Sequence, residues 1–185
     1  MSDEREERVL ILAPVGRDAA LARETLNRAG LTSEICSGIQ GLCDEAASGV
    51  GAILLTQEAL SPEAVEHLLG MIRSQPPWSD VPIVVLVSGA EATTAINYLS
   101  AVFGHDVNAS FRERPVRAAT LVNAIHVALR SRRRQYELRD HLAALAATQE
   151  SERQSRLAAE QSVRIRDEFL ASVAHDLKNP LGAIK

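Results

Sequence analysis

The residues best suited to chemistry lie close together near the carboxyl end of the sequence. Segment 169–181 reads F-L-A-S-V-A-H-D-L-K-N-P-L, and it places His175 directly before Asp176. An imidazole nitrogen with a free lone pair is a nucleophile, and a carboxylate that accepts the hydrogen of the other ring nitrogen strengthens its attack. The pattern therefore predicts a nucleophile at His175, with Asp176 as its acid–base partner.

The spacing of this segment fits a helix with an apolar side and a reactive side. His175 lies about 160° around the helix from the apolar stripe, so a phosphate donor could reach it. Asn179 follows one turn later on the same face, where its amide could orient a water or a phosphoryl group. Pro180 lacks an amide hydrogen, so it leaves the carbonyl of Asp176 unpaired and should bend or loosen the helix. The stripe consists of Leu170, Val173 and Leu177.

In its residue order, segment 169–181 closely resembles the H box of histidine kinases, the phosphoacceptor helix of their dimerisation domain. The resemblance implies that His175 accepts phosphate from ATP, that Asp176 assists the transfer and that Asn179 supports dephosphorylation of a cognate response regulator. It also implies an ATP-binding domain that uses ATP and Mg²⁺ in the full-length kinase. The sequence ends at Lys185, before any such domain, so we expect this fragment to bind no cofactor and to be inactive alone.

Upstream, short apolar runs alternate with amphipathic stretches, as in repeated strand–helix units around a parallel sheet. We expect an α/β fold with a five-stranded, doubly wound parallel sheet, of the receiver or flavodoxin type. The strands are expected at Val9–Leu12, Thr32–Ser37, Ala52–Leu55, Ile83–Val87 and Val107–Phe111. Helices are expected at Asp18–Ala29, around Ile39–Ala47 and Val65–Ile72, at Ala92–Phe103, and from Val116 onward.

A long carboxyl-terminal helix is predicted because residues 116–179 contain neither Gly nor Pro. Apolar residues recur at alternating spacings of four and three from Leu138 to Leu177, with a polar middle section. We expect a parallel dimeric coiled coil, with a solvated helix as the alternative. The expected divisions are a charged tail (1–8), a receiver-like domain (9–130), a coiled-coil helix (131–168) and the truncated start of the phosphoacceptor domain (169–185).

The front domain resembles a response-regulator receiver, but it departs from that family's chemical motifs. Ala13 and Pro14 stand where the resemblance implies metal-binding acids, and Thr56 stands in place of the phosphoacceptor aspartate. The hydroxyl residue Ser88 and the switch aromatic Phe111 are retained, while Arg114 replaces the lysine before a proline. Without carboxylate oxygens a Mg²⁺ ion has no reason to bind, so we expect no metal site. The domain is therefore interpreted as a pseudo-receiver that dimerises or binds a protein partner; the alternative is a folded cap on the helix.

Composition limits the remaining function classes. A net charge of −4 and a pI near 5.8 argue against general nucleic-acid binding, and the cluster Arg130, Arg132, Arg133 and Arg134 is interpreted as a solvent-exposed junction. Two cysteines are too few for a disulfide framework. No signal sequence or membrane segment is evident, so we expect a cytoplasmic protein. The alternative to a histidine kinase is a non-catalytic dimeric scaffold or phosphotransfer protein without its own ATP-binding domain.

Overall fold

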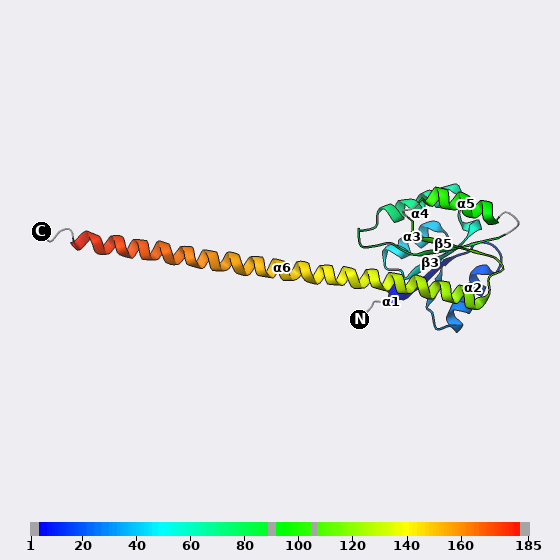
Figure 1. Ribbon diagram of the computed structural model, residues 1–185, viewed down its shortest axis with the longest axis horizontal. Helices are drawn as coiled ribbons and strands as arrows, with labels where there is room; N and C mark the ends of the chain where they lie inside the picture. Colours follow the sequence, from blue (N-terminus) through cyan, green and yellow to red (C-terminus); the bar gives the residue numbers. More distant parts are fainter. Residues whose placement is uncertain (1–3, 89–91, 105–106, 182–185) are drawn as a thin grey trace. The chain divides into compact units, whose positions relative to one another are not determined.

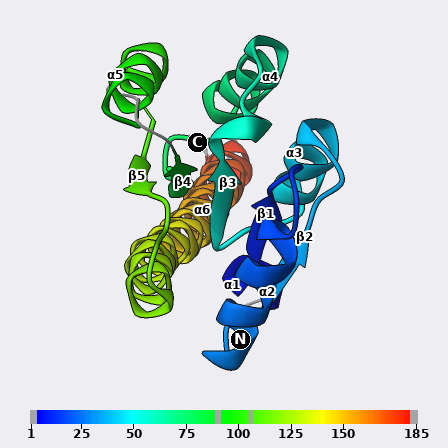
Figure 2. The ribbon, with the colours of Figure 1, turned by 90° about the vertical axis from the view of Figure 1, so that its right-hand side faces the viewer.

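The computed structural model describes residues 4–88, 92–104 and 107–181, with side chains through residue 173 except that of residue 172. Its centre is one parallel β-sheet, which lies at the amino-terminal side of the long helix in sequence (Figure 1). The sheet has five strands in the order β2-β1-β3-β4-β5 (Figure 2). This confirms the predicted five-stranded, doubly wound sheet. The strands are β1 (Val9–Leu12), β2 (Ser33–Ile35), β3 (Ala52–Thr56), β4 (Ile83–Val87) and β5 (Ala109–Glu113).

Helices cover both faces of the sheet. One face packs against α3, α4 and α5, and the other packs against α2 and the first part of α6 (Figure 2). The helices are α1 (Glu4–Glu7), α2 (Asp18–Arg28), α3 (Ile39–Ala47), α4 (Pro62–Arg73), α5 (Ala92–Phe103) and α6 (Ala118–Leu181), with a 3₁₀ turn, η1, at Gln57–Ala59. Parallel strands joined by helices bring all five carboxyl ends to one edge, where the functional residues of such sheets gather.

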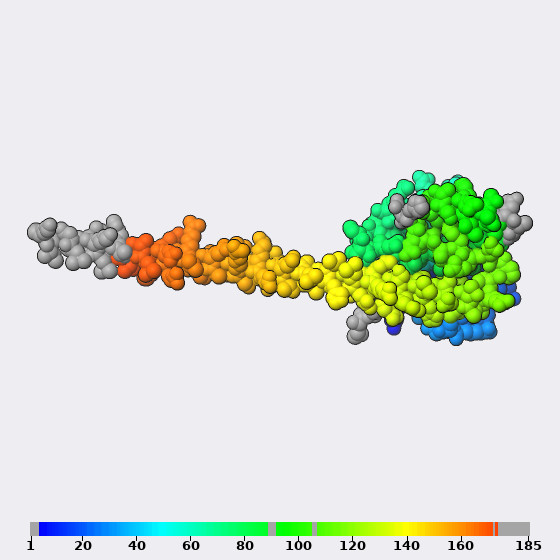
Figure 3. Space-filling view, viewed as in Figure 1, coloured from blue at the N-terminus to red at the C-terminus, as the bar shows by residue number. Residues whose placement is uncertain are grey.

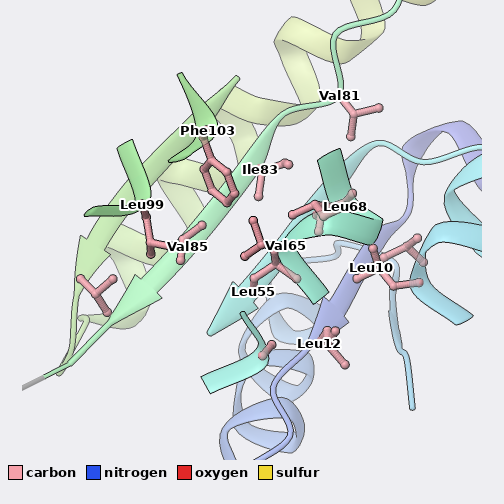
Figure 4. Close-up of a cluster of buried hydrophobic side chains, with 14 of the residues drawn as sticks. Leu10, Leu12, Leu55, Val65, Leu68, Val81, Ile83, Val85, Leu99 and Phe103 are labelled. Atoms are coloured by element: carbon pink, nitrogen blue, oxygen red, sulfur yellow. The ribbon is translucent and has the colours of Figure 1, made fainter. Parts of the chain in front are cut away.

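The three central strands form the core because every residue in them except Thr56 is apolar. All residues of β1 and β4 are buried, and so are the four aliphatic residues of β3. Leu10, Leu55 and Val85 pack against Val65 and Leu68 of α4, while Leu99 and Phe103 of α5 extend the same cluster (Figure 4). Burial on both faces explains why these strands lack the alternating pattern of a half-exposed sheet.

The amino-terminal residues differ from the expected charged tail. Residues 4–7 form the short helix α1, and Arg8 is 8% exposed. Arg8 forms ion pairs with Glu34 at 2.6 Å and Glu45 at 2.8 Å, and its Nε donates to the carbonyl of Gly49 at 3.2 Å. The segment is ordered because these partners, which lie 26 to 41 residues away, hold its end.

The compact α/β unit extends to Arg139, nine residues beyond the expected boundary at 130. Arg132 and Tyr136 of α6 are buried in this unit, 4% and 7% exposed. The interpretation of the run Arg130 to Arg134 as a solvent-exposed junction is therefore wrong for Arg132, whose side chain anchors the helix. Figure 3 shows residues of α6 before position 140 lying against the unit.

The second unit comprises residues 140–185, and its described part is helix. Every described side chain in it is exposed. The backbone of α6 is helical through Pro180 to Leu181, so Pro180 does not end the helix, and a bend there stays a prediction. Among the described residues, no helix combines the length and apolar character needed to span a membrane.

Candidate functional site

The carboxyl edge of the sheet brings together three of the residues singled out in the sequence. Thr56 ends β3, Ser88 follows β4 and Arg114 follows β5. Ala13 and Pro14 follow β1 at the same edge, half-buried and exposed respectively, and they offer no side-chain ligand. The sheet topology accounts for this meeting, since β1, β3, β4 and β5 are parallel neighbours.

The guanidinium of Arg114 is the centre of this edge. Its Nη1 is paired with Asp18, from the first turn of α2, and its Nη2 is paired with Glu58 in η1. The same Nη2 donates to Ser88 Oγ at 2.8 Å. The Arg114 side chain is 18% exposed. One cation thus connects two carboxylates and a hydroxyl from three separate segments, and we call Asp18, Glu58, Ser88 and Arg114 the arginine cluster.

Glu58 stays ionised in this arrangement. Burial alone would raise the pKa of its carboxyl, but the backbone amide hydrogen bond, together with the hydrogen bond and charge of Arg114, outweighs that effect. The pKa of Glu58 therefore lies below its usual value. A carboxylate that is already paired with an internal guanidinium is a poor ligand for an added divalent cation. No grouping of three or more metal-ligating side chains occurs in the described part of the chain.

Thr56 stands at the position expected for a phosphoacceptor and is 2% exposed. Its hydroxyl oxygen has no hydrogen-bond partner among the described residues. It nevertheless lies close enough to Glu58 to favour the charged form of that carboxyl. The nearby carboxylate of Glu58 is held by Arg114, so it is a poor base for activating this buried hydroxyl.

Phe111 packs against α5 and the hydrophobic core. Its ring stacks on Phe103 of α5, with centroids 6.4 Å apart and an interplanar angle of 16°. Phe111 is half-buried and packs against the larger hydrophobic cluster. The switch aromatic expected from the sequence is thus held by the core.

A groove of about 620 Å³ lies beside the arginine cluster, between α2 and the first turns of α6. Its apolar wall includes Leu21, Leu86 and Leu121. The polar end of the groove is the arginine cluster itself, in which Asp18, Glu58 and Ser88 are paired with Arg114 while the buried Nε of Arg114 has no hydrogen-bond partner among the described residues.

The two cysteines, Cys36 and Cys43, are free thiols. Burial, followed by the nearby carboxylates of Glu34 and Glu45, raises the pKa of Cys36 to about 11. Burial also raises the pKa of Cys43, which packs against the core as expected. Both thiols are therefore protonated near neutral pH and are poor nucleophiles.

The side chains of the four site residues of the carboxyl-terminal motif lie outside the described residues. The backbone of α6 carries His175, Asp176, Asn179 and Pro180 in one helix. The arrangement of their side chains, and their roles, stay predictions from the sequence.

Sequence reasoning missed the partners of Arg114. In the sequence, Asp18 marks only the start of an expected helix, and Glu58 is assigned no role. The sequence did contain a signal for these partners, because Asp18 and Glu58 both follow strands whose carboxyl ends share one edge of the sheet. It also missed the contacts of Arg132, because an arginine within a run of arginines gives no sign of burial.

Comparisons with known proteins support the fold. No protein-family model matches the chain, and no curated protein matches it. A response regulator receiver domain protein from Clostridium thermocellum superposes with a TM-score of 0.53 at 16% identity, covering 68% of this chain and 96% of that chain. The signal receiver domain of a putative Luxo repressor protein from Vibrio parahaemolyticus gives 0.56 at 13% identity, covering 72% and 97%.

A third solved structure combines a trimeric coiled-coil segment of yeast Spc42 with another protein. It superposes with a TM-score of 0.55 at 20% identity, covering 79% of this chain and 91% of that chain. At these identities the likeness establishes the architecture, a receiver-type fold followed by a long carboxyl-terminal helix.

Proposed function

We propose that this chain is the regulatory amino-terminal part of a sensor histidine kinase, in which His175 receives phosphate from ATP and passes it to a response regulator. The observation that carries the proposal is the complete motif of residues 169–181 on the same helix, α6, that begins within a receiver-type fold. His175, its adjacent acid and Asn179 are the residue types that reversible phosphoryl transfer through an imidazole requires.

In this proposal the residues of the motif have separate roles. His175 attacks the terminal phosphate of ATP, and Asp176 holds or removes the proton of the imidazole. Asn179 acts in the reverse direction, on the phosphorylated regulator. ATP and Mg²⁺ would be held by a separate ATP-binding domain of the full-length protein, and the residues of the present chain would supply only the acceptor.

The α/β unit is proposed to act as a pseudo-receiver. The support is the arginine cluster, because Arg114 places a guanidinium between the carboxylates of Asp18 and Glu58. A fixed internal cation makes Mg²⁺ unnecessary for balancing those acids, and Thr56 offers no carboxylate for phosphorylation. The unit would then act on the helix through protein contacts rather than through covalent modification.

The chain is further proposed to be a homodimer. Large apolar side chains of α6 are about half exposed in the single chain, as expected for an unpaired coiled-coil seam. Tyr136 does not belong to this seam, because it is buried in its own α/β unit, so the interface starts at Leu138. The exposed residues at the expected seam spacing are Leu138, Leu142, Leu145, Val163, Leu170 and Val173.

The second candidate is a dimeric scaffold or phosphotransfer protein that has an acceptor helix and no ATP-binding domain of its own. The same motif favours it, since the acceptor chemistry is identical. The two candidates differ in the source of the phosphate.

The deciding experiment is autophosphorylation of the natural full-length protein with labelled ATP. A kinase should form a base-stable, acid-labile phosphoramidate, and His175→Ala should abolish it. Asp176→Asn should slow labelling by about 10²- to 10⁴-fold, as expected for loss of an acid–base group. Asn179→Ala should preserve labelling and impair dephosphorylation of the regulator. Label that persists in His175→Ala would contradict the assignment, whereas labelling only by a second kinase would favour the phosphotransfer protein.

A further inference from the structure

Residues 131–139 of α6, here called the root, are attached to the α/β unit by more than apolar packing. Arg132 donates from Nε to the carbonyl of Val50 at 3.1 Å and from Nη1 to Ser79 Oγ at 2.7 Å. Tyr136 donates its hydroxyl hydrogen to the same Val50 carbonyl at 3.0 Å. Val50 leads into β3, and Ser79 precedes β4. The root is thus joined to the amino-terminal ends of two central strands.

The buried charge of Arg132 is balanced without a carboxylate. Among the described residues Arg132 has no ion pair, although its side chain is 4% exposed. Its guanidinium lies over the rings of Tyr136, at 4.4 Å, and Trp78, at 5.4 Å. Cation–π contacts and neutral acceptors replace only part of the hydration that such a cation loses. Detaching the root from the α/β unit would return Arg132 to water. The attachment that these contacts make by themselves is therefore reversible.

Carboxylates that pair with other arginines of the root come from α1, here called the strap. Glu6 of the strap forms an ion pair with Arg139, and Glu7 forms one with Arg133 at 3.0 Å. The Glu6 side chain is 15% exposed, so its pair is shielded from solvent. The strap and the root are 126 to 133 residues apart in the sequence.

The strap cannot be stable by itself. A helix of four residues has too few hydrogen bonds to offset the cost of nucleation, so its contacts must hold it. It lies against the segment before β3, where a Cβ at Gly49 would be 3.2 Å from the Arg5 Cβ. A Cβ at Gly51 would be 2.5 Å from Leu129 of α6 and 2.9 Å from the Glu7 carbonyl carbon. Strap, strand and helix therefore meet at Gly51 without spare room.

We propose that the strap is a detachable electrostatic latch, which holds the root of α6 on the α/β unit through Glu6 and Glu7. Without these carboxylates Arg133 and Arg139 each lose an ion pair, within a root that also carries Arg132 and Arg134. High salt, or a basic surface that binds the strap, would then loosen the root while the sheet stays folded. The inference concerns the attachment of α6 alone, and it holds whether or not His175 is a phosphoacceptor.

The test is amide hydrogen exchange, measured by mass spectrometry on the 185-residue chain at low salt. Glu6→Gln combined with Glu7→Gln should speed exchange of residues 133–139 by about 5- to 20-fold, since two ion pairs of modest strength are lost. The exchange rates of the β3 and β4 amides should be unchanged, which would show that the α/β unit stays folded. Glu4→Gln is the matched control, because Glu4 lies in the same helix and has no ion pair within the described part of the chain.

Two further measurements distinguish an electrostatic latch from simple packing: the response to salt, and a pair of substitutions that exchanges the two charges of an ion pair. In the unaltered chain, 0.5 M NaCl should accelerate the same amides, because it screens the exposed pair, and the double variant should respond far less. Glu6→Arg with Arg139→Glu should restore protection relative to Glu6→Arg alone. Equal root protection in the unaltered chain and the double variant at both salt concentrations would overturn the proposal, and so would acceleration in Glu4→Gln of the same size.

Discussion

Thr56 carries a hydroxyl that the fold buries without a hydrogen-bond partner among the described residues. A buried polar group in this state costs free energy, because it has lost its hydrogen bonds to water. Valine has nearly the same shape and no such group. We therefore expect Thr56→Val to raise the free energy of unfolding by about 0.5–1 kcal/mol, measured by urea denaturation.

The control for this substitution is Ser61→Ala. Ser61 caps α4, with its Oγ accepting from the amide of Ala64 at 3.2 Å. Its loss should lower the unfolding free energy by about 0.5–2 kcal/mol, and so shows that the assay detects a single hydroxyl. If Thr56→Val proves destabilising by a similar amount, the Thr56 hydroxyl has a partner and the account of this strand end is incorrect.

At the same scale, the sequence predicted part of the site. Thr56, Ser88 and Arg114 could be placed at one edge because each follows a strand of a parallel sheet. Their partners could not be predicted, because the position of Glu58 depends on a 3₁₀ turn and that of Asp18 on where α2 begins. Spacing along the chain carries no information on which carboxylate a long arginine side chain will reach.

At the level of elements, a strand or helix was predictable from the sequence when its stability comes from its own residues. The strands β1, β3 and β4 were predictable because their own residues are continuously apolar. The helix α1 was not, since its four polar residues fold only against distant partners. The domain boundary was placed too early for the same reason, because Arg132 is a charged residue that the unit buries.

The attachment of α6 should depend on Tyr136. Its hydroxyl donates to the Val50 carbonyl and accepts from Arg132 Nη2 at 3.1 Å. Tyr136→Phe removes the partner of Arg132 Nη2 and of the Val50 amide, which donates to the same hydroxyl at 3.3 Å, while the Val50 carbonyl keeps its bond from Arg132 Nε. The substitution should lower the unfolding free energy by about 1–3 kcal/mol in thermal or urea denaturation. Tyr98→Phe is the matched control: Tyr98 is 62% exposed, so the change should stay within about 0.5 kcal/mol. Equal effects of the two substitutions would show that the Tyr136 hydroxyl does not anchor the helix.

At the scale of the whole molecule, the proposed seam of α6 determines the oligomeric state. Leu142 and Leu145 are 50% and 60% exposed in the single chain, and pairing would bury them at about 25 cal/mol per Å² of apolar surface. Light scattering of the 185-residue chain at tens of micromolar should therefore report a dimer. Leu142→Glu with Leu145→Glu should give a monomer, because it places four charges in the seam.

The matched control for the seam is Leu21→Glu. Leu21 is equally exposed, at 50%, but it lies on α2 of the α/β unit and should leave the dimer intact. A monomer for the unaltered chain at high micromolar concentration would contradict the proposed coiled coil. Dissociation by Leu21→Glu would instead locate the main interface on the α/β unit.

Arginine supplies every cation in the attachments described above: Arg8 at the sheet edge, Arg114 in its cluster, and Arg132 with its neighbours at the root. Lysine is absent from the first 177 residues. A guanidinium keeps its proton at any pH that a cell reaches, whereas an ammonium or imidazolium can lose it. A rise in pH therefore does not deprotonate any cation in these attachments. A fall in pH can act on them only by protonating their carboxylates. The internal charge pattern of the α/β unit therefore depends on cations that keep their charge over the physiological pH range.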